Sequence, residues 1–225
     1  IADGLAHLRL TNPAQGNVLD LAAIAALAAA VAQVENASVR AILITAEGRN
    51  FCVGGDLRGM AASDDRGGLL RQMADGLHAS LRRIEALGVP VVVAVNGSAA
   101  GAGLSLVAFG DIVIGAEDSS YVMAYTAIGL SARGGSTFAL PRLIWLRLTQ
   151  EMAYLNRKLE AGEALAAGLI TRVVDDEALP EEAMAAARQL AAGPPGAFRR
   201  IKRLLGDSLR QSFDAQLDNE AEAIS

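Results

Sequence analysis

Residues 90–103 read Pro-Val-Val-Val-Ala-Val-Asn-Gly-Ser-Ala-Ala-Gly-Ala-Gly, an apolar run that leads directly into a glycine-rich turn. An uninterrupted run of β-branched and apolar residues is typical of a strand that is buried on both faces of a sheet. Glycine placed directly after such a strand indicates that the backbone itself must approach another group. The stretch therefore predicts a buried strand followed by a loop that offers free backbone N–H groups.

The same combination occurs earlier in the chain, where an apolar strand predicted at residues 39–46 is followed by a glycine-rich loop at residues 48–59. Neither loop matches a nucleotide-binding motif. The second loop lacks the Lys-Ser/Thr ending of a P-loop, and Gly101-Ala102-Gly103 is not followed by the third glycine of a dinucleotide fingerprint. Two loops with free N–H donors can form an oxyanion hole, aided by the dipole of a helix that begins near Gly103. Tight turns without a ligand are the simpler alternative.

Outward from these loops, segments typical of strands and of helices alternate. Strands are predicted at residues 6–10, 39–46, 90–95, 112–114 and 171–174, and helices at residues 21–34, with Asp20 as the cap, 66–87 and 104–109. Residues 121–137 are expected to be irregular, and helical patterns resume near Leu140 and continue to the end. This alternation predicts an α/β fold with one main domain and a helical C-terminal section.

Composition limits the class of protein. The 225 residues are 52% hydrophobic and 20% charged, which excludes a disordered chain. The longest apolar stretch, residues 21–32, is too short to span a bilayer. A net charge of −5 argues against nucleic acid or an anionic membrane as partner. Cys52 is the only cysteine, so an intramolecular disulfide and a cysteine-based zinc site are excluded, and we expect a cytoplasmic protein without a metal.

Several motifs together resemble the crotonase (enoyl-CoA hydratase/isomerase) superfamily, in the order and spacing of that family. They cover nearly the whole chain and lie at residues 51–57 (FCVGGDL), 90–97 (PVVVAVNG), 101–103 (GAG), 110–112 (GDI), 125–130 (YTAIGL), 134–137 (GGST), 140–143 (LPRL) and 164–174. The resemblance implies a spiral of ββα turns. We expect residues 1–190 to form this spiral core and residues 191–225 a truncated C-terminal helical segment. Because the first residue is Ile1 and not Met, the chain is expected to start inside the domain.

The resemblance also implies a function. Members of the family bind acyl-CoA thioesters and hold an enolate-like oxyanion with two peptide N–H groups, which by position would belong to Gly55 and Ala102. CoA would then be part of the substrate, with no permanently bound cofactor, and the chain would serve fatty acid metabolism. Homotrimers or dimers of trimers are the expected assemblies.

The sequence departs from the family where the acid/base chemistry is expected. Relatives take carboxylates from three positions, and this chain has Ser105, Tyr125 and Arg133 there. Tyr125 is interpreted as a hydrogen-bond donor or as an aromatic wall of the pocket. Arg133 is interpreted either as a residue that binds a substrate carboxylate through two hydrogen bonds or as a surface or interface arginine. His78 aligns with a histidine that some relatives use to activate water, and its alternative is a residue without catalytic duty.

Candidate contacts to CoA follow from the same resemblance. The expected contacts are Gly54, Asp56, Leu57, Arg58 and Lys202. The basic residues among them would meet the phosphates of CoA, and a solvated basic face is the alternative. Asp56 is also expected to cap the helix that follows the first loop.

Three functions remain open from the sequence. The first is an acyl-CoA enzyme of hydratase/isomerase type, a lyase or an isomerase, based on the intact oxyanion loops. The second is decarboxylation or another enolate-forming step in which Arg133 orients a substrate carboxylate. The third is a catalytically silent acyl-CoA-binding or oligomer-partner protein, suggested by the three absent carboxylates.

Overall fold

The computed structural model describes residues 1–224. The strands are β1 (Leu5–Leu10), β2 (Ala41–Ala46), β3 (Val91–Val95), β4 (Ser98–Ala100), β5 (Ile112–Ala116), β6 (Ser120–Val122), β7 (Lys158–Glu160) and β8 (Arg172–Val174). The α-helices are α1 (Leu21–Glu35), α2 (Leu57–Ala62), α3 (Arg66–Leu87), α4 (Ala102–Phe109), α5 (Ser136–Leu143), α6 (Leu146–Leu155), α7 (Ala161–Ala167), α8 (Leu179–Ala192), α9 (Pro195–Ser208) and α10 (Phe213–Ile224). Two short 3₁₀ helices, η1 (Pro13–Gln15) and η2 (Thr126–Ile128), lie in the connections.

Five strands form one parallel sheet in the order β1-β2-β3-β5-β8. All five lie where the apolar runs predict strands, and α3 has its predicted ends at Arg66 and Leu87. The strand β3 is central, with Val93 in register with Ile44 of β2 and with Val113 of β5. The carboxyl ends of parallel neighbours meet at one edge of a sheet, so the loops after β2 and β3 leave from the same edge.

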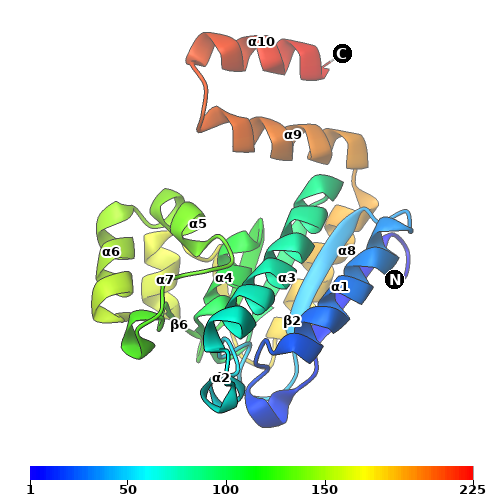
Figure 1. Ribbon diagram of the computed structural model, residues 1–225. Coiled ribbons are helices and arrows are strands. Elements are labelled where there is room, and N and C mark those ends of the chain that lie inside the picture. The colour runs from blue at the N-terminus through cyan, green and yellow to red at the C-terminus, as the bar shows by residue number, and fades with distance from the viewer. Residues whose placement is uncertain (225) are drawn as a thin grey trace.

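Helices cover both faces of this sheet, which explains why its strands are apolar on both sides (Figure 1). On one face, α1, α3 and α4 pack against the sheet and form the larger core. On the other face α8 lies alone, and its alanines allow a close approach to β2, β3 and β5. Val91, Val92, Val93 and Val95 are completely buried between these layers. The rigid sheet therefore fixes the starting points of both glycine loops.

A second sheet is small, and the sequence patterns do not predict it. It has the order β4-β6-β7, with β4 parallel to β6 and β6 antiparallel to β7. The expectation that residues 121–137 are irregular is therefore wrong at both ends, because β6 includes Tyr121 and α5 begins at Ser136. Strands of three residues are too short for a period of two to be recognised. They are stabilised instead by burial, since Tyr121 is fully buried between Ala99 and Leu159.

The last two helices extend from the body of the molecule as a hairpin (Figure 1). Large apolar side chains remain exposed on this hairpin, including Leu205 on α9 at 66% and Phe213 on α10 at 76%. The hairpin touches the rest of the protein near α5, where the guanidinium of Arg210 lies 5.5 Å from the ring centre of Phe138. Within residues 1–224, the helices are all too short or too polar to cross a bilayer.

Candidate active site

The two glycine loops are held against each other by main-chain hydrogen bonds. The N–H of Cys52 donates to the carbonyl of Ser98 at 3.1 Å, and the N–H of Ala100 donates to the carbonyl of Cys52 at 2.9 Å. Gly54 has a φ of +100° and lies so close to the second loop that a Cβ there would stand 3.1 Å from the carbonyl oxygen of Ala100. Glycine is therefore required at this contact because of both the backbone angle and the space.

This contact brings together the two predicted oxyanion donors. Gly55 follows Gly54 in the first loop, and Ala102 is the first residue of α4, directly after Gly101 with a φ of +53°. Within residues 1–224, neither the N–H of Gly55 nor that of Ala102 has a protein acceptor. Both residues line the same cavity. The positive end of the α4 dipole adds to the field at Ala102.

The cavity that contains these donors has a volume of about 440 Å³ and is mainly apolar. The structure brings seven of the predicted site residues to its wall: Gly54, Gly55, Leu57, His78, Ala102, Tyr125 and Arg133. Apolar side chains complete the wall, among them Met60, Leu70 and Leu130. Within the described chain, no aspartate or glutamate lines the cavity, which agrees with the three carboxylates absent from the sequence.

Tyr125 is almost completely buried at 7% exposure, and its hydroxyl belongs to a hydrogen-bonded group. The hydroxyl lies 3.2 Å from the Oγ of Ser105 and donates to the carbonyl of Arg133, also at 3.2 Å. Burial raises the pKa of Tyr125 above its ordinary value, although the hydrogen bond with Ser105 partly opposes this. The hydroxyl therefore stays neutral in the physiological range, where it can donate a hydrogen bond but cannot act as a base.

His78, on α3, has one ring nitrogen occupied. Its Nε2 accepts the N–H of Gly134 at 2.9 Å, so this nitrogen carries a lone pair and the neutral ring has its proton on Nδ1. An Nε2 that already accepts a hydrogen bond is not free to take a proton from water. In this arrangement His78 contacts the loop that carries Arg133, and its interpretation as the water-activating residue has no support through Nε2.

The guanidinium of Arg133 lies beside Gly55. Its Nη2 occupies the space that a Cβ on Gly55 would need, and its Nε and Nη1 are buried without a hydrogen-bond partner in the described chain. Burial lowers the pKa of this guanidinium from its ordinary value. Because the ordinary value of arginine is very high, the group remains charged. Arg133 is thus a half-buried cation without a protein counterion among residues 1–224.

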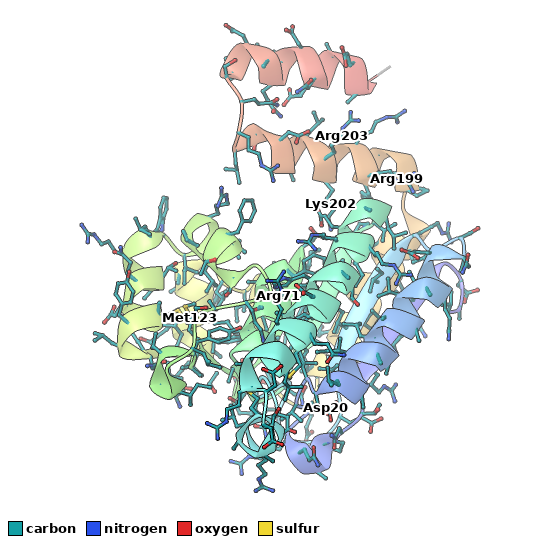
Figure 2. The ribbon with its side chains drawn as sticks, in the orientation of Figure 1. Asp20, Arg71, Met123, Arg199, Lys202 and Arg203 are labelled. Atoms are coloured by element: carbon teal, nitrogen blue, oxygen red, sulfur yellow. The ribbon has the colours of Figure 1, made fainter. Side chains whose placement is uncertain are left out.

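Three of the expected CoA contacts lie outside the cavity wall. Asp56 accepts the N–H of Arg58 at 3.1 Å and caps α2, which confirms its expected capping role. Arg58 is exposed on α2. Lys202 is on α9, on the side that faces the end of α3, and its Nζ is 2.7 Å from the Oδ2 of Asp111 and 3.5 Å from the Oε2 of Glu85 (Figure 2). The structure does not bring Lys202 to the other site residues.

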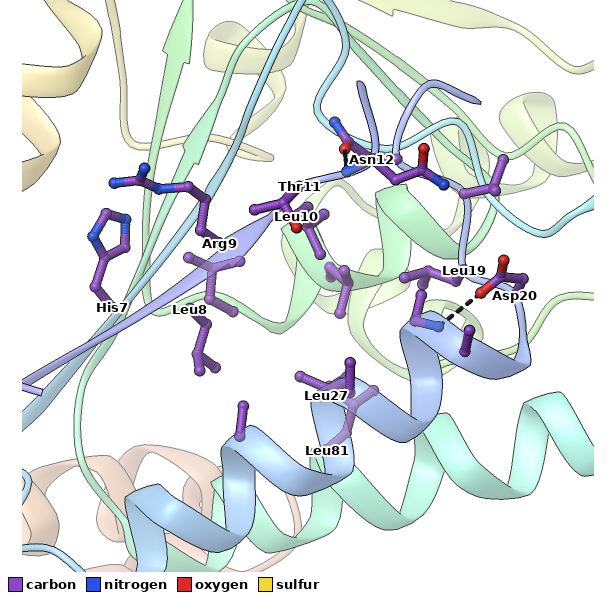
Figure 3. Close-up of a pocket in the computed structure, with 18 of the residues that line it drawn as sticks. His7, Leu8, Arg9, Leu10, Thr11, Asn12, Leu19, Asp20, Leu27 and Leu81 are labelled. Carbon is purple, nitrogen blue, oxygen red and sulfur yellow. Dashed lines mark hydrogen bonds between the residues drawn. The ribbon is translucent and has the colours of Figure 1, made fainter. Parts of the chain in front are cut away.

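A second cavity of about 530 Å³ lies between β1, α1 and α3 (Figure 3). Its polar groups have structural partners. His7 lies 2.8 Å from the hydroxyl of Thr45, and Asp20 caps α1 by accepting the N–H of Ala23 at 2.7 Å. The oxyanion loops do not contribute to this cavity. We therefore assign the active site to the smaller cavity beside Gly55 and Ala102.

Several polar side chains of the site have structural roles that the sequence does not reveal. Ser105 is buried at 1% exposure and donates to the carbonyl of Arg133 at 2.6 Å, whereas the sequence marks it only as the place of an absent carboxylate. Ser136 donates to the same carbonyl at 3.3 Å. Both hydroxyls donate to a main-chain carbonyl, and since every residue has one, the sequence contains no motif for such a contact. Cys52 is completely buried, and burial raises the pKa of its thiol to about 11, so it is not a reactive thiolate.

Comparisons with known proteins give matches over the whole length of the chain. The chain matches the family model for enoyl-CoA hydratase/isomerase over residues 1–225. It is 36% identical to the 1,2-epoxyphenylacetyl-CoA isomerase of Escherichia coli strain K12, covering 98% of this chain and 85% of the relative. It is 28% identical to the 4-chlorobenzoyl coenzyme A dehalogenase-2 of an Arthrobacter species, over 99% of this chain and 82% of the relative.

Solved structures are similar over the same length. The crystal structure of an enoyl-CoA hydratase from Polaromonas sp. JS666 superposes with a TM-score of 0.91 at 32% sequence identity and covers 98% of this chain and 87% of its own. The predicted fold class, an α/β crotonase-like fold with a helical C-terminal section, is thereby confirmed.

Proposed function

The chain belongs to the enoyl-CoA hydratase/isomerase family, and we propose that it stabilises the enolate of an acyl-CoA thioester between the N–H groups of Gly55 and Ala102. One observation carries the proposal: two N–H donors from separate loops line one apolar cavity, and neither has an acceptor within residues 1–224. Buried main-chain donors are nearly always paired, so a pair of free donors facing one space indicates a ligand oxygen between them.

The proposed chemistry places negative charge on this oxygen. When a bond at the carbon next to the thioester carbonyl gives up its electron pair, the charge moves onto the carbonyl oxygen. The two N–H groups are then better paired than in the ground state, and one such donor contributes roughly 3 kcal/mol to the transition state. In the same proposal the CoA moiety lies along residues 53–58, where Val53 and Leu57 are partly exposed.

Hydrogen exchange at the α-carbon tests the proposal directly. A saturated acyl-CoA is incubated with the protein in heavy water, and deuterium uptake is followed by mass spectrometry. We expect uptake that depends on the protein: water in the cavity takes the α-proton, the two N–H groups stabilise the resulting enolate, and a deuteron from the solvent then replaces the lost proton. The control is the same thioester without protein. Absence of uptake across several acyl chains contradicts proton-transfer chemistry on those substrates, and release of carbon dioxide from malonyl-CoA then separates decarboxylation from a silent binding protein.

Decarboxylation is the second candidate, and it is favoured by the cavity wall without aspartate or glutamate and by the unpaired Arg133. In this step the bond between the α-carbon and a carboxylate breaks, its electron pair forms the enolate, and carbon dioxide leaves. Water then supplies the proton that the α-carbon needs. No protein base is required to form the enolate, so the same oxyanion hole is sufficient. Release of carbon dioxide from malonyl-CoA distinguishes this candidate from the first.

We further propose that copies of the chain associate as a trimer or a dimer of trimers in the cytoplasm. The support is the group of exposed apolar side chains on α9 and α10: Ile201, Leu205, Phe213 and Leu217. Single exposed apolar residues are common on protein surfaces, whereas several on one pair of helices indicate an interface. Light scattering during size-exclusion chromatography is expected to give three or six times the chain mass of 23.3 kDa. A monomer at micromolar concentration would contradict the assembly.

A further inference from the structure

The unpaired guanidinium of Arg133 is the polar group least satisfied by the protein itself. Transfer of a cation from water into an apolar site is unfavourable unless an anion or several acceptors pair with it. The Nε and Nη1 atoms of Arg133 are buried without partners, and the wall around them contains Met60, Leu130 and Ala132. An arrangement of this kind is stable when a ligand provides the missing acceptors.

The backbone of Arg133 is held unusually firmly, in contrast to its side chain. The carbonyl of Arg133 accepts hydrogen bonds from Ser105, Tyr125 and Ser136, and the next N–H, of Gly134, donates to His78. We call these four side chains the clamp. They come from α3, α4, the start of η2 and α5, and together they hold both ends of one peptide group. The position from which the guanidinium extends is thus fixed by four elements.

We propose that Arg133 selects acyl-CoA thioesters that carry a carboxylate on the α-carbon, and that His78 is the positioning residue that holds Arg133 for this purpose. The inference rests on the proposed function, because it places the thioester oxygen between Gly55 and Ala102. It adds the chemical class of the acyl group and a role for His78 that differs from activation of water.

The position of the carboxylate follows from the contact between Arg133 and Gly55. The Nη2 atom lies directly beside Gly55, whose N–H holds the thioester oxygen in the proposal. Three bonds separate this oxygen from the carbon of a carboxylate on the α-carbon. A carboxylate one carbon further away would have to fold back to reach the same nitrogen atoms. The planar guanidinium can bind both oxygens of a carboxylate, a geometry that a lysine cannot reproduce.

The assignment of His78 follows from the direction of its hydrogen bond. The ring accepts the N–H of Gly134 at 2.9 Å, and this amide belongs to the peptide that links Gly134 to Arg133. Without the acceptor, a main-chain donor in the cavity wall would lose its partner, and the loop would lose one of the four contacts that set its position. His78 therefore acts on the substrate through Arg133.

Binding of three probes tests the selectivity: acetyl-CoA, malonyl-CoA and succinyl-CoA, which have no carboxylate, one on the α-carbon and one on the next carbon. Dissociation constants are measured by calorimetry, with KM used for any probe that is turned over. We expect the intact protein to prefer malonyl-CoA over both other probes by about tenfold or more, and Arg133→Gln to remove this preference. Arg133→Lys should restore only part of it, since the charge returns without the planar geometry.

Substitutions of His78 test the positioning role. We expect His78→Ala to weaken the preference for malonyl-CoA and His78→Gln to retain most of it, since a glutamine side-chain oxygen can accept the N–H of Gly134. In an Arg133→Gln background, His78→Ala should change the preference no further. Such a double-mutant cycle isolates an effect that passes through Arg133 from a general loss of structure.

Several results would overturn the inference. An equal loss of acetyl-CoA and malonyl-CoA binding in Arg133→Gln would make Arg133 a contact of the thioester or a structural residue. A preference for succinyl-CoA would refute the α-carbon position. An effect of His78→Ala that persists in the Arg133→Gln background would refute positioning through Arg133. Failure to bind any of the three probes counts against the proposed function itself, whereas acetyl-CoA binding without a preference for malonyl-CoA counts against this inference alone.

Discussion

Replacing Gly55 by proline is expected to lower kcat/KM for α-proton exchange or any other enolate-forming turnover by about 10² to 10³-fold, which corresponds to roughly 3–4 kcal/mol. Proline lacks the N–H that we assign to the thioester oxygen, and the charge on this oxygen develops only as the reaction proceeds. The loss should therefore appear mainly in kcat. Exchange rates measured by mass spectrometry at saturating and at low acyl-CoA concentrations separate the two parameters.

Two further variants control for steric effects. Gly55→Ala keeps the N–H and adds only the Cβ, which meets the flexible ends of Arg133 and Met60, the latter at 2.6 Å. Its activity should thus fall much less than that of the proline variant. Ala102→Pro removes the second donor at the first position of α4, where proline is well tolerated in helices. If Gly55→Pro and Ala102→Pro both folded and kept the activity of the unaltered protein, the assignment of the oxyanion hole would be wrong.

The second large effect concerns stability. Gly103 lies inside α4, where helix propensity alone predicts that alanine stabilises by about 1 kcal/mol. The structure predicts the opposite sign. A Cβ at Gly103 would collide with the carbonyl oxygen of Cys52 and would stand 2.8 Å from the Cβ of Cys52, both parts of the neighbouring loop. We expect Gly103→Ala to lower the free energy of unfolding by roughly 2–3 kcal/mol, measured by urea denaturation.

A matched control lies in α7. Gly162 is also helical and exposed, and a Cβ there would have no heavy atom within 4 Å. Gly162→Ala should raise the free energy of unfolding by up to about 1 kcal/mol because the helix gains propensity without a collision. If Gly103→Ala stabilised the protein as much as Gly162→Ala does, the close contact between the two loops would be refuted.

The main sheet could be predicted from the sequence because its strands are long enough to be recognised. An apolar run such as that of β3, when a glycine turn follows it, is hard to interpret as anything other than a buried strand. The three-residue strands β4, β6 and β7 escaped prediction since their pairing depends on residues far apart in the chain, as in the pairing of Tyr121 with Leu159. Local propensity carries no information on such partners.

The contact between the two glycine loops was predictable for a related reason. Glycines that permit close approach, such as Gly54, leave a mark in the sequence, whereas side chains that hold a carbonyl do not. The bonds of Ser105 and His78 to the loop at Arg133 and Gly134 became visible only in three dimensions. Lys202 is a similar case. Its charge suggested a phosphate contact, and its ion pair with Asp111 at 2.7 Å became visible only in the folded chain.

The hydrogen bonds between the loops of Cys52 and Ala100 bear on how such a protein diversifies. The two donors are placed by peptide groups, so substitutions of the surrounding side chains can accumulate without moving them. Loss of an acid or base then changes which reaction is accelerated while the electrophilic half of the catalytic apparatus persists. The relatives named above are an isomerase and a dehalogenase that both bear CoA in their names. If the proposed oxyanion hole is correct, exchange of the side chains in the wall can change the reaction while the two main-chain donors keep their places.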